Sequence, residues 1–203
     1  MDVAQNAPRT VILAGDEASL YLQASLMRVW APKGKTPVVR VDAGRDSTHF
    51  YGALNLESGQ EVVLRSERMN GHVSALFLKR ILLAYPDVPL LLLWDRATWH
   101  KGAEVRAVLE ANPRLEIVWF PPGCPQLNPQ EHVWKAAREF VSHNHRHAKL
   151  ETLAPAFEQY LSAERFACSL LKSHAYEPLC ARFKSEVYKQ AGQGNRGRSA
   201  GAA

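Results

Sequence analysis

The chain has 203 residues, enough for one substantial hydrophobic core and too few for two large domains. Its 46% hydrophobic and 22% charged residues are typical of a globular protein, no apolar run is long enough to cross a bilayer, and the N-terminus lacks a signal-peptide pattern. A net charge of +5 permits a polyanionic partner, and three cysteines at no metal-ligand spacing (Cys124, Cys168 and Cys180) fit a reducing cytoplasm.

The first half of the chain predicts strands, a hairpin and one helix. We expect residues 1–9 to form a flexible leader and residues 10–15 (TVILAG) to form a strand that ends at Asp16-Glu17. Residues 19–30 are ambiguous, residues 31–37 indicate a loop, and residues 37–41 indicate a short extended piece. Residues 48–56 and 61–65 flank a Gly-containing turn and predict a β-hairpin. Residues 70–84 carry apolar side chains at helical spacing, with Asn70 as the N-cap candidate.

The second half alternates strands and helices. Residues 90–94 (LLLLW) form an uninterrupted apolar run, typical of a strand buried on both faces. Residues 103–110 predict a short helix, and residues 117–120 predict a strand that must end at the following Pro-Pro-Gly. A helix is expected over 128–145, with Asn128 as N-cap, Pro129 first and Glu131 third. One or two further helices are expected over 150–171, and disorder from about residue 190.

This order of elements favours an α/β fold. Early strands that are neighbours in sequence should pair antiparallel, and later strands joined by crossover helices should run parallel. The expected architecture is a mixed, five-stranded sheet flanked by helices.

Packing in a hydrophobic core does not account for the positions of three carboxylates in the predicted elements: Asp16, Asp95 and Glu131. The stretch from Asp95 to Glu131 holds one helix and one strand, which is what the chain needs to return to the same edge of the sheet. Clustered carboxylates suit hard cations such as Mg²⁺, and two such ions roughly 3.5–4 Å apart catalyse in-line phosphoryl transfer. The spacing therefore indicates a site for two-metal chemistry.

Each carboxylate also has a purely structural interpretation. Asp16 is a plausible turn residue at a strand end, and Asp42, which also follows an apolar run, is its rival as the first ligand. Asp95 is able to cap the segment after its strand. Glu131 stands at capping-box spacing from Asn128, so a helix start alone would explain it. We favour the metal site because it accounts for the three together.

Two motifs, WDRATWHKG and WFPPGCPQLNPQEHVWK, resemble the DDE endonuclease domain of mariner-like bacterial insertion-sequence transposases. The similarity extends over about residues 10–150 and includes the segment around Asp16. The positions that match the family pattern are Asp95, His100, Pro121, Pro125, Leu127, Asn128, Pro129, Glu131 and Trp134.

The resemblance implies an RNase H-like DDE catalytic domain over residues 10–175, followed by a basic segment over 176–203. It implies cut-and-paste DNA transposition with two Mg²⁺ ions, for which Mn²⁺ substitutes. Asp16 would bridge both ions, Asp95 would bind one and Glu131 the other. The implied partners are double-stranded DNA, at the transposon ends and the target, and a second copy of the chain in a homodimer.

The chain departs from the family pattern in two respects. Cys124 stands where an aromatic residue is common. The first strand begins within the first dozen or so residues, so the family's N-terminal helix-turn-helix region is expected to be separate or missing. We therefore expect a catalytic fragment, one half of a split transposase, or a truncated copy.

Further residues are weaker candidates for DNA contacts. Lys135 and Arg138 follow Glu131 by one and two helical turns, although an ordinary solvated helix face explains them as well. The other candidates are Trp99, His100, Lys101 and Asn128, with a buried structural Trp99 as the equal alternative.

A helical His143–His147 pair suggests metal ligands, but a solvated helix end is favoured. Basic residues at 182, 184, 189, 196 and 198 give the C-terminus non-specific affinity for nucleic acid at most.

Two other functions compete with transposition. The chain could be a catalytically silent DNA-binding or assembly module derived from a transposase. It could also be an RNase H-like nuclease that acts on another nucleic acid, such as a hybrid or a structured RNA.

Overall fold

The computed structural model describes residues 10–23, 31–35, 38, 46–123, 127–143, 145 and 147–166. Five strands form one sheet in the order β3-β2-β1-β4-β5. The antiparallel part contains β1 (Val11–Tyr21), β2 (Ser47–Asn55) and β3 (Glu61–Ser66), and β4 (Leu90–Trp94) and β5 (Leu115–Trp119) add to it in parallel. The predicted mixed sheet and hairpin are confirmed. Expectations for residues 1–9, Asp42, the cysteines and the C-terminal basic segment lie outside the described residues.

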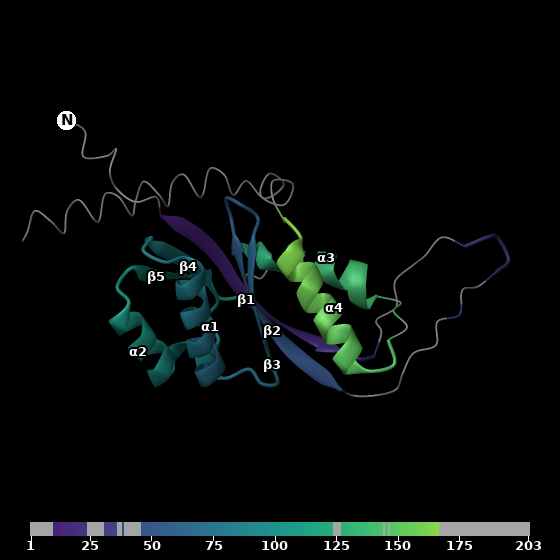
Figure 1. The fold of residues 1–203 in the computed structure, drawn as a ribbon, viewed down its shortest axis with the longest axis horizontal. Coiled ribbons are helices and arrows are strands. Elements are labelled where there is room, and N and C mark those ends of the chain that lie inside the picture. The colour runs from purple at the N-terminus through teal and green to yellow at the C-terminus, as the bar shows by residue number, and fades with distance from the viewer. Residues whose placement is uncertain are drawn as a thin grey trace, which may run out of the picture.

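Helices cover both faces of this sheet (Figure 1). The helices α1 (Gly71–Ala84) and α2 (Ala103–Ala111) pack on one face, and α3 (Gln130–Ala137) and α4 (Leu150–Ala163) pack on the other. Each face therefore has its own apolar core. No helix in the described part of the chain is long and apolar enough to span a membrane.

Successive side chains of β1 and β4 point to opposite faces of the sheet and therefore belong to different cores. Ile12, Ala14 and Ala18 join the core beneath α3 and α4, whereas Leu13 joins the opposite one. Successive side chains of a strand point to opposite faces, so Asp16 points toward α3 and Glu17 points toward the α1 side. In β4, Leu93 faces α3 and Trp94 does not. Asp95 consequently turns to the same face as Asp16.

The first strand extends further than the sequence predicted. It does not end at Asp16-Glu17 but continues to Tyr21, because β2 pairs with it in an antiparallel ladder from Leu13 to Tyr21. What ends near Asp16 is the parallel pairing with β4, whose last partners are Ala14 and Leu93. Asp16 and Asp95 each follow two residues later, so they stand side by side where the two strands part.

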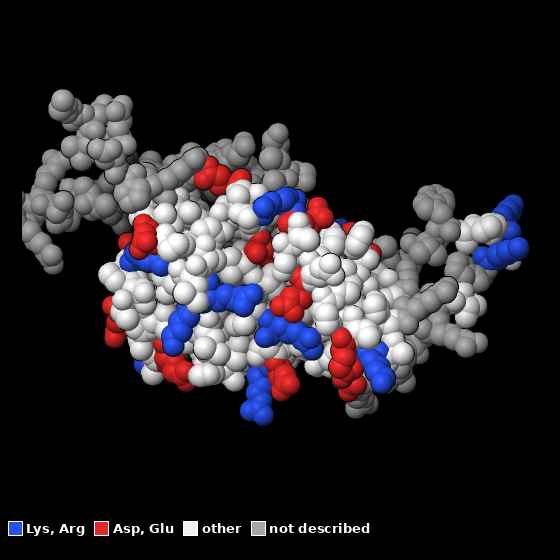
Figure 2. All heavy atoms as spheres, viewed as in Figure 1, with Lys and Arg blue, Asp and Glu red and all other residues white. Residues whose placement is uncertain are grey.

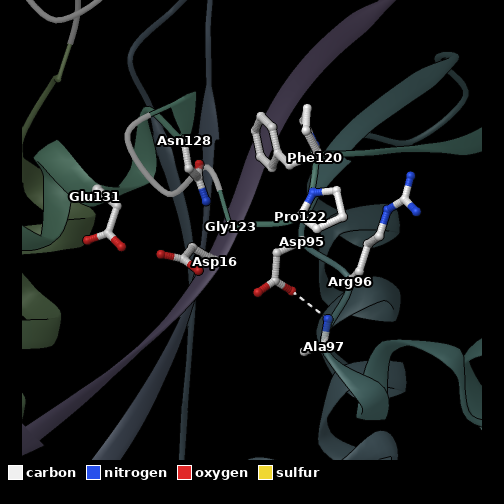
Figure 3. Close-up of a pocket in the computed structure, with 10 residues that line it drawn as sticks. Asp16, Asp95, Arg96, Ala97, Phe120, Pro122, Gly123, Asn128 and Glu131 are labelled. Carbon is white, nitrogen blue, oxygen red and sulfur yellow. Dashed lines mark hydrogen bonds between the residues drawn. The ribbon is translucent and has the colours of Figure 1, made fainter.

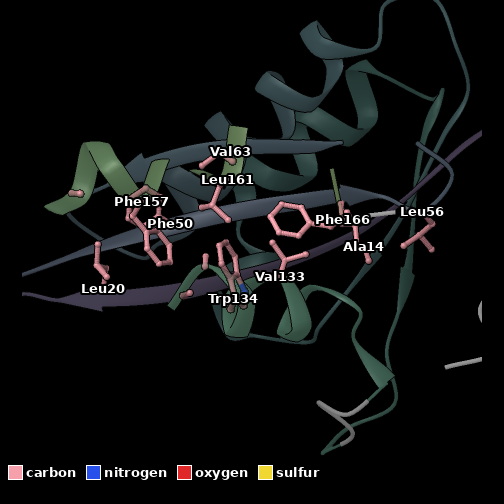
Figure 4. Close-up of a cluster of buried hydrophobic side chains, with 14 of the residues drawn as sticks. Ala14, Leu20, Phe50, Leu56, Val63, Val133, Trp134, Phe157, Leu161 and Phe166 are labelled. Atoms are coloured by element: carbon pink, nitrogen blue, oxygen red, sulfur yellow. The ribbon is translucent and has the colours of Figure 1, made fainter. Parts of the chain in front are cut away.

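Large buried side chains hold α3 and α4 against the sheet by packing (Figure 4). Trp134 of α3 and Phe157 of α4 are fully buried, and the Phe157 ring lies 5.1 Å from that of Phe50 in β2. Burial of an aromatic side chain stabilises a fold by roughly 2–3 kcal/mol. The position of α3 over β1 is therefore fixed by packing as well as by hydrogen bonds.

The predicted helix over 128–145 is shorter in the structure. The α-helix ends at Ala137, a π-helical turn covers Arg138–Ser142, and His143 is extended. His143 and His147 therefore do not share a helix face, and the predicted solvated helix end is also wrong, because His145 is buried and its Nδ1 accepts the N–H of His147.

Candidate active site

A pocket of about 410 Å³ opens at the point where β1 and β4 part (Figure 3). Asp16, Asp95 and Glu131 all line it, and in Figure 3 the carboxylate of Asp16 lies between the other two. The rest of the lining consists of Arg96, Ala97, Asn128 and the segment Phe120–Gly123. The fold thus brings together the three carboxylates that the sequence singled out.

Asp16 is held in a partly buried position in the middle of β1. Its Oδ2 accepts a hydrogen bond of 3.1 Å from Nε1 of the buried Trp134, which fixes this oxygen. Burial, together with the negative charges of Glu17 and Glu131, raises the pKa of Asp16 to about 7. A nearby cation would offset that penalty and keep the carboxylate ionised.

A close approach of backbone and side chains lies behind Asp16. Gly52 of β2 is its antiparallel partner, and a methyl group at Gly52 would overlap Gln130, Glu61 and Trp134. Gln130 donates a hydrogen bond to Glu61, whose other carboxylate oxygen is buried with no partner among the described residues. Burial raises the pKa of Glu61 well above its usual range. This position can only be a glycine if α3 is to lie so close.

Asp95 follows the last residue of β4 and is half exposed on the pocket side. Its Oδ1 accepts the N–H of Ala97 at 3.0 Å and lies 2.8 Å from Nδ1 of His100. The hydrogen bond from His100 is the main reason why the pKa of Asp95 is below its usual value. Asp95 is therefore ionised at neutral pH.

Glu131 reaches the pocket from the beginning of α3 and is exposed. Among the described residues no hydrogen bond runs from its carboxylate back to the helix start, so the capping interpretation has no support in the structure. Asn128 does the capping: its Oδ1 accepts the N–H of Gln130 at 3.1 Å, and its Nδ2 donates to the Gly15 carbonyl at 3.1 Å. Asn128, expected to contact DNA, is buried and ties α3 to β1.

His100 lies behind Asp95, in a short 3₁₀ turn (Thr98–Lys101), and its side chain is fully buried. Nε2 is 2.9 Å from Oε1 of Glu17, and the ring stacks on Trp94 with centroids 3.6 Å apart. Burial alone would lower the pKa of His100, but its hydrogen bonds to Asp95 and Glu17 outweigh burial and raise it to about 9. A buried ring has no surface for the DNA contact that the sequence suggested.

The remaining DNA-contact candidates do not line the pocket. Lys101 and Lys135 are exposed, and Lys135 Nζ is 3.9 Å from Glu139 on a solvated helix face. Arg138 begins the π-helical turn. Trp99 packs edge-on against His100, which agrees with the structural alternative for this residue.

Two residues near the carboxylates were missed by the sequence analysis. Arg96, directly after Asp95, is a cation in the pocket lining. Glu17 has a side chain that is only 5% exposed and is bonded to His100. The signal for Glu17 was its position next to Asp16 in a strand, since adjacent residues of a strand face opposite sides and so require separate partners.

The donor set fits divalent metal. Three carboxylates meet, and burial together with neighbouring carboxylates destabilises the anionic form of Asp16. Asp95 has one oxygen bonded to Ala97 and the other facing the pocket. Carboxylate oxygens are the ligands that Mg²⁺ and Mn²⁺ prefer. On the face shown in Figure 2, Lys and Arg are interspersed with Asp and Glu rather than gathered in one positive area.

Several known proteins are similar to part of this chain. The uncharacterized 39 kDa protein of insertion element IS630 from Shigella sonnei is 26% identical over 135 residues, which cover 64% of this chain and 38% of the relative. The Mos1 transposase paired-end complex with left transposon end matches with a TM-score of 0.58 at 16% identity, over 76% of this chain and 48% of that one. The mariner Mos1 paired end complex with Mg matches with a TM-score of 0.62 at 17% identity, over 86% and 55%.

The chain spans about two fifths to just over half of the length of these proteins. At such low identity the structural matches establish the fold, which is the RNase H-like fold of transposase catalytic domains. Residues 11–154 also match the DDE superfamily endonucleases, a stretch that contains the whole sheet and the three pocket carboxylates. This match covers well over half of the 203 residues, so the chain belongs to the DDE superfamily endonuclease family.

Proposed function

We propose that this chain is the catalytic domain of a transposase, which hydrolyses a DNA strand at a transposon end and joins the freed 3′-hydroxyl to target DNA. The observation that carries the proposal is the meeting of Asp16, Asp95 and Glu131 around one pocket, from two neighbouring strands and a helix. Family membership and the fold shared with Mos1 transposase complexes support the same class of reaction.

In this proposal the three carboxylates hold two Mg²⁺ ions, with Mn²⁺ as a substitute. Asp16, Asp95 and Glu131 would hold these ions, and the carboxylate of Asp16 lies between the other two. When bound, the ions supply positive charge that stabilises the attacking and leaving oxygens of an in-line displacement. Trp134 and Asn128 orient this ligand set, the first through Asp16 Oδ2 and the second by fixing the start of α3.

The proposed substrate is double-stranded DNA, at the transposon end and at the target. Arg96 borders the carboxylates and is suited to contact a phosphate beside the cleaved bond. Phosphate contacts position a nucleic acid without reading its sequence, so we assign end recognition to a helix-turn-helix region outside the described residues. Pairing of two transposon ends is assigned to a homodimer.

The first test is Mn²⁺ binding, measured by calorimetry on the full chain and on Asp16→Asn, Asp95→Asn and Asp87→Asn. Asp87 is an exposed turn residue with a left-handed backbone that Asn tolerates, and it is a matched control. We expect the two site variants to bind Mn²⁺ at least tenfold more weakly and Asp87→Asn to bind as the native chain does. Equal binding by all four proteins would refute the metal site.

The second test compares Mn²⁺-dependent cleavage of a DNA duplex, an RNA–DNA hybrid and an RNA of the same sequence. Cleavage of the DNA duplex that is lost in Asp95→Asn supports the proposal. Preferred cleavage of the hybrid or the RNA would favour an RNase H-like nuclease of different specificity. Metal binding without cleavage of any substrate, also when a DNA-binding partner is supplied, would favour the catalytically silent module.

A further inference from the structure

A buried imidazole links two carboxylates that belong to different faces of the sheet. His100 has a side chain with no exposed surface, and its two ring nitrogens lie 2.8 Å from Asp95 Oδ1 and 2.9 Å from Glu17 Oε1. Each of these hydrogen bonds needs an N–H donor, because ionised carboxylates only accept. With both nitrogens engaged, His100 has none left for a metal ion. The ring therefore acts as a bridge between β1 and the residue that follows β4.

The two carboxylate oxygens of Asp95 have different surroundings. Oδ1 receives both Nδ1 of His100 and the N–H of Ala97, at 2.8 and 3.0 Å. The other oxygen points into the pocket toward Asp16 (Figure 3). A carboxylate with one oxygen held by two donors has little rotational freedom, so its second oxygen is already oriented when a cation arrives.

Packing prevents the ring of His100 from turning. It stacks on Trp94, 3.6 Å between centroids with 23° between planes, and Trp99 contacts its edge. The Nδ1 atom is also 3.2 Å from the Asp95 carbonyl oxygen, which holds the ring against the turn that follows β4. Glu17 anchors the far nitrogen from the middle of β1, with a side chain that is 5% exposed. Neither Glu17 nor His100 lines the pocket.

We propose that Glu17 and His100 are positioning residues, which fix the Asp95 carboxylate in the orientation that binds the catalytic metal ion. This inference rests on the proposed function of the site, because it assigns to both residues an effect on Asp95 as a metal ligand. Neither residue touches substrate or metal. Loss of such hydrogen-bonded support of a ligand typically weakens metal affinity tenfold to a hundredfold.

Two substitutions of His100 separate its two hydrogen bonds. The amide nitrogen of Asn occupies nearly the place of Nδ1, so His100→Asn keeps the donor to Asp95 and loses the bond to Glu17. The longer His100→Gln places its amide nearly at Nε2, so it keeps the bond to Glu17 and loses the donor to Asp95. His72→Gln is the matched control, since Nδ1 of His72 is 2.7 Å from Glu104 in an exposed pair.

We would measure Mn²⁺ affinity by calorimetry and thermal unfolding by circular dichroism on the full chain and these variants. We expect His100→Gln to bind Mn²⁺ about tenfold or more weakly, His100→Asn to recover part of that loss, and His72→Gln to bind normally. A purely structural His100 would lower the melting temperature of both variants without this split in affinity. If His100→Gln is unfolded, Glu17→Ala provides the same comparison, because it removes the anchor of the ring and leaves Asp95 intact.

The outcomes distinguish the inference from the function on which it rests. If native chain and Asp95→Asn bind Mn²⁺ equally, the metal site itself is refuted. If Asp95→Asn loses the metal but His100→Gln (or Glu17→Ala) keeps native affinity, the function stands and the positioning role is overturned. Equal losses in His100→Asn and His100→Gln would also overturn it.

Discussion

The Asp16 carboxyl carries a free-energy cost that depends on pH. In the metal-free protein its pKa is about 7, against an ordinary value of 3.8. Between these two values the folded chain retains a proton that the unfolded chain has released, so stability decreases as pH rises from about 4 to 7. One pKa unit corresponds to about 1.4 kcal/mol, which sets an upper limit of roughly 4 kcal/mol for this cost above pH 7.

Asp16→Asn should therefore be more stable than the native chain at pH 8 in EDTA and equally stable at pH 4. Asn lacks the charge but retains an oxygen that accepts from Trp134. The measurement is urea unfolding at both pH values, with the exposed Asp87→Asn as control. A native chain and an Asp16→Asn variant with the same pH dependence would show that Asp16 titrates normally.

Gly52 is the second residue on which the site depends. A methyl group there would overlap Trp134, which holds Asp16, and also the Gln130–Glu61 pair. We expect Gly52→Ala to cost about 1–3 kcal/mol, the usual range for overpacking, and to weaken Mn²⁺ binding by displacing α3. Gly71→Ala, where the nearest atom to an added methyl group is 3.4 Å away, should be close to neutral. Native stability of Gly52→Ala in urea would contradict this account.

The sequence predicted which carboxylates line the pocket, but not the hydrogen bonds and burial of the residues around them. Asp95 and Glu131 follow an apolar run and a capping motif that are visible in the sequence, and the structure brings both to the pocket. The bridge from Glu17 to His100 was not predictable, because it depends on the continuation of β1 past Glu17 and on the packing that buries His100. Burial of His100 and Asn128 likewise follows from tertiary packing, which has no local sequence signal.

At the scale of elements, Asn128 and Asn70 make an instructive pair. Each caps a helix with its side-chain oxygen, Asn128 at α3 and Asn70 at α1, where Oδ1 accepts the N–H of Val73 at 2.9 Å. The side-chain amide of Asn128 also donates to the Gly15 carbonyl in β1, whereas Asn70 is linked to β2 through its backbone N–H, which donates to the Tyr51 hydroxyl. The start of α3 is thereby tied to the residue before Asp16, whereas the start of α1 has no such tie to the site.

We therefore expect Asn128→Ala to lower stability by about 2 kcal/mol and to weaken Mn²⁺ affinity severalfold, because Glu131 moves with the helix start. Asn70→Ala should cost about 1 kcal/mol and leave Mn²⁺ affinity unchanged. Urea unfolding and calorimetry on the two variants make the comparison. A similar effect of both on metal binding would mean that general loosening, and not the tie to β1, controls the site.

Element boundaries were predicted where local signals are strong. The strand at 90–94 and the cap of the helix at 71–84 agree with the sequence prediction, since a pure apolar run and an Asn cap are local features. The helix after Asn128 ended earlier than predicted, at a π-helical turn over 138–142. The sequence beyond that turn is polar and compatible with a helix, so it contains no local signal that the helix ends there.

At the scale of the whole molecule, the site joins parts of the chain that only folding brings together. Asp16 comes from the central strand β1, Asp95 from the end of β4, and Glu131 from α3 on one face of the sheet. An unfolded chain would hold these carboxylates far apart and bind metal weakly. Metal binding should therefore be coupled to global stability.

Saturating Mn²⁺ should raise the stability of the native chain by about 2.7 kcal/mol when free metal is 100 times the dissociation constant. Asp16→Asn should gain little, so the variant that is more stable in EDTA at pH 8 should lose most or all of that advantage in Mn²⁺. Thermal unfolding of both proteins in EDTA and in Mn²⁺ tests this exchange. If Mn²⁺ raised the melting temperature of both equally, the ion would bind elsewhere, and the raised pKa of Asp16 would reflect burial alone rather than a site built for metal.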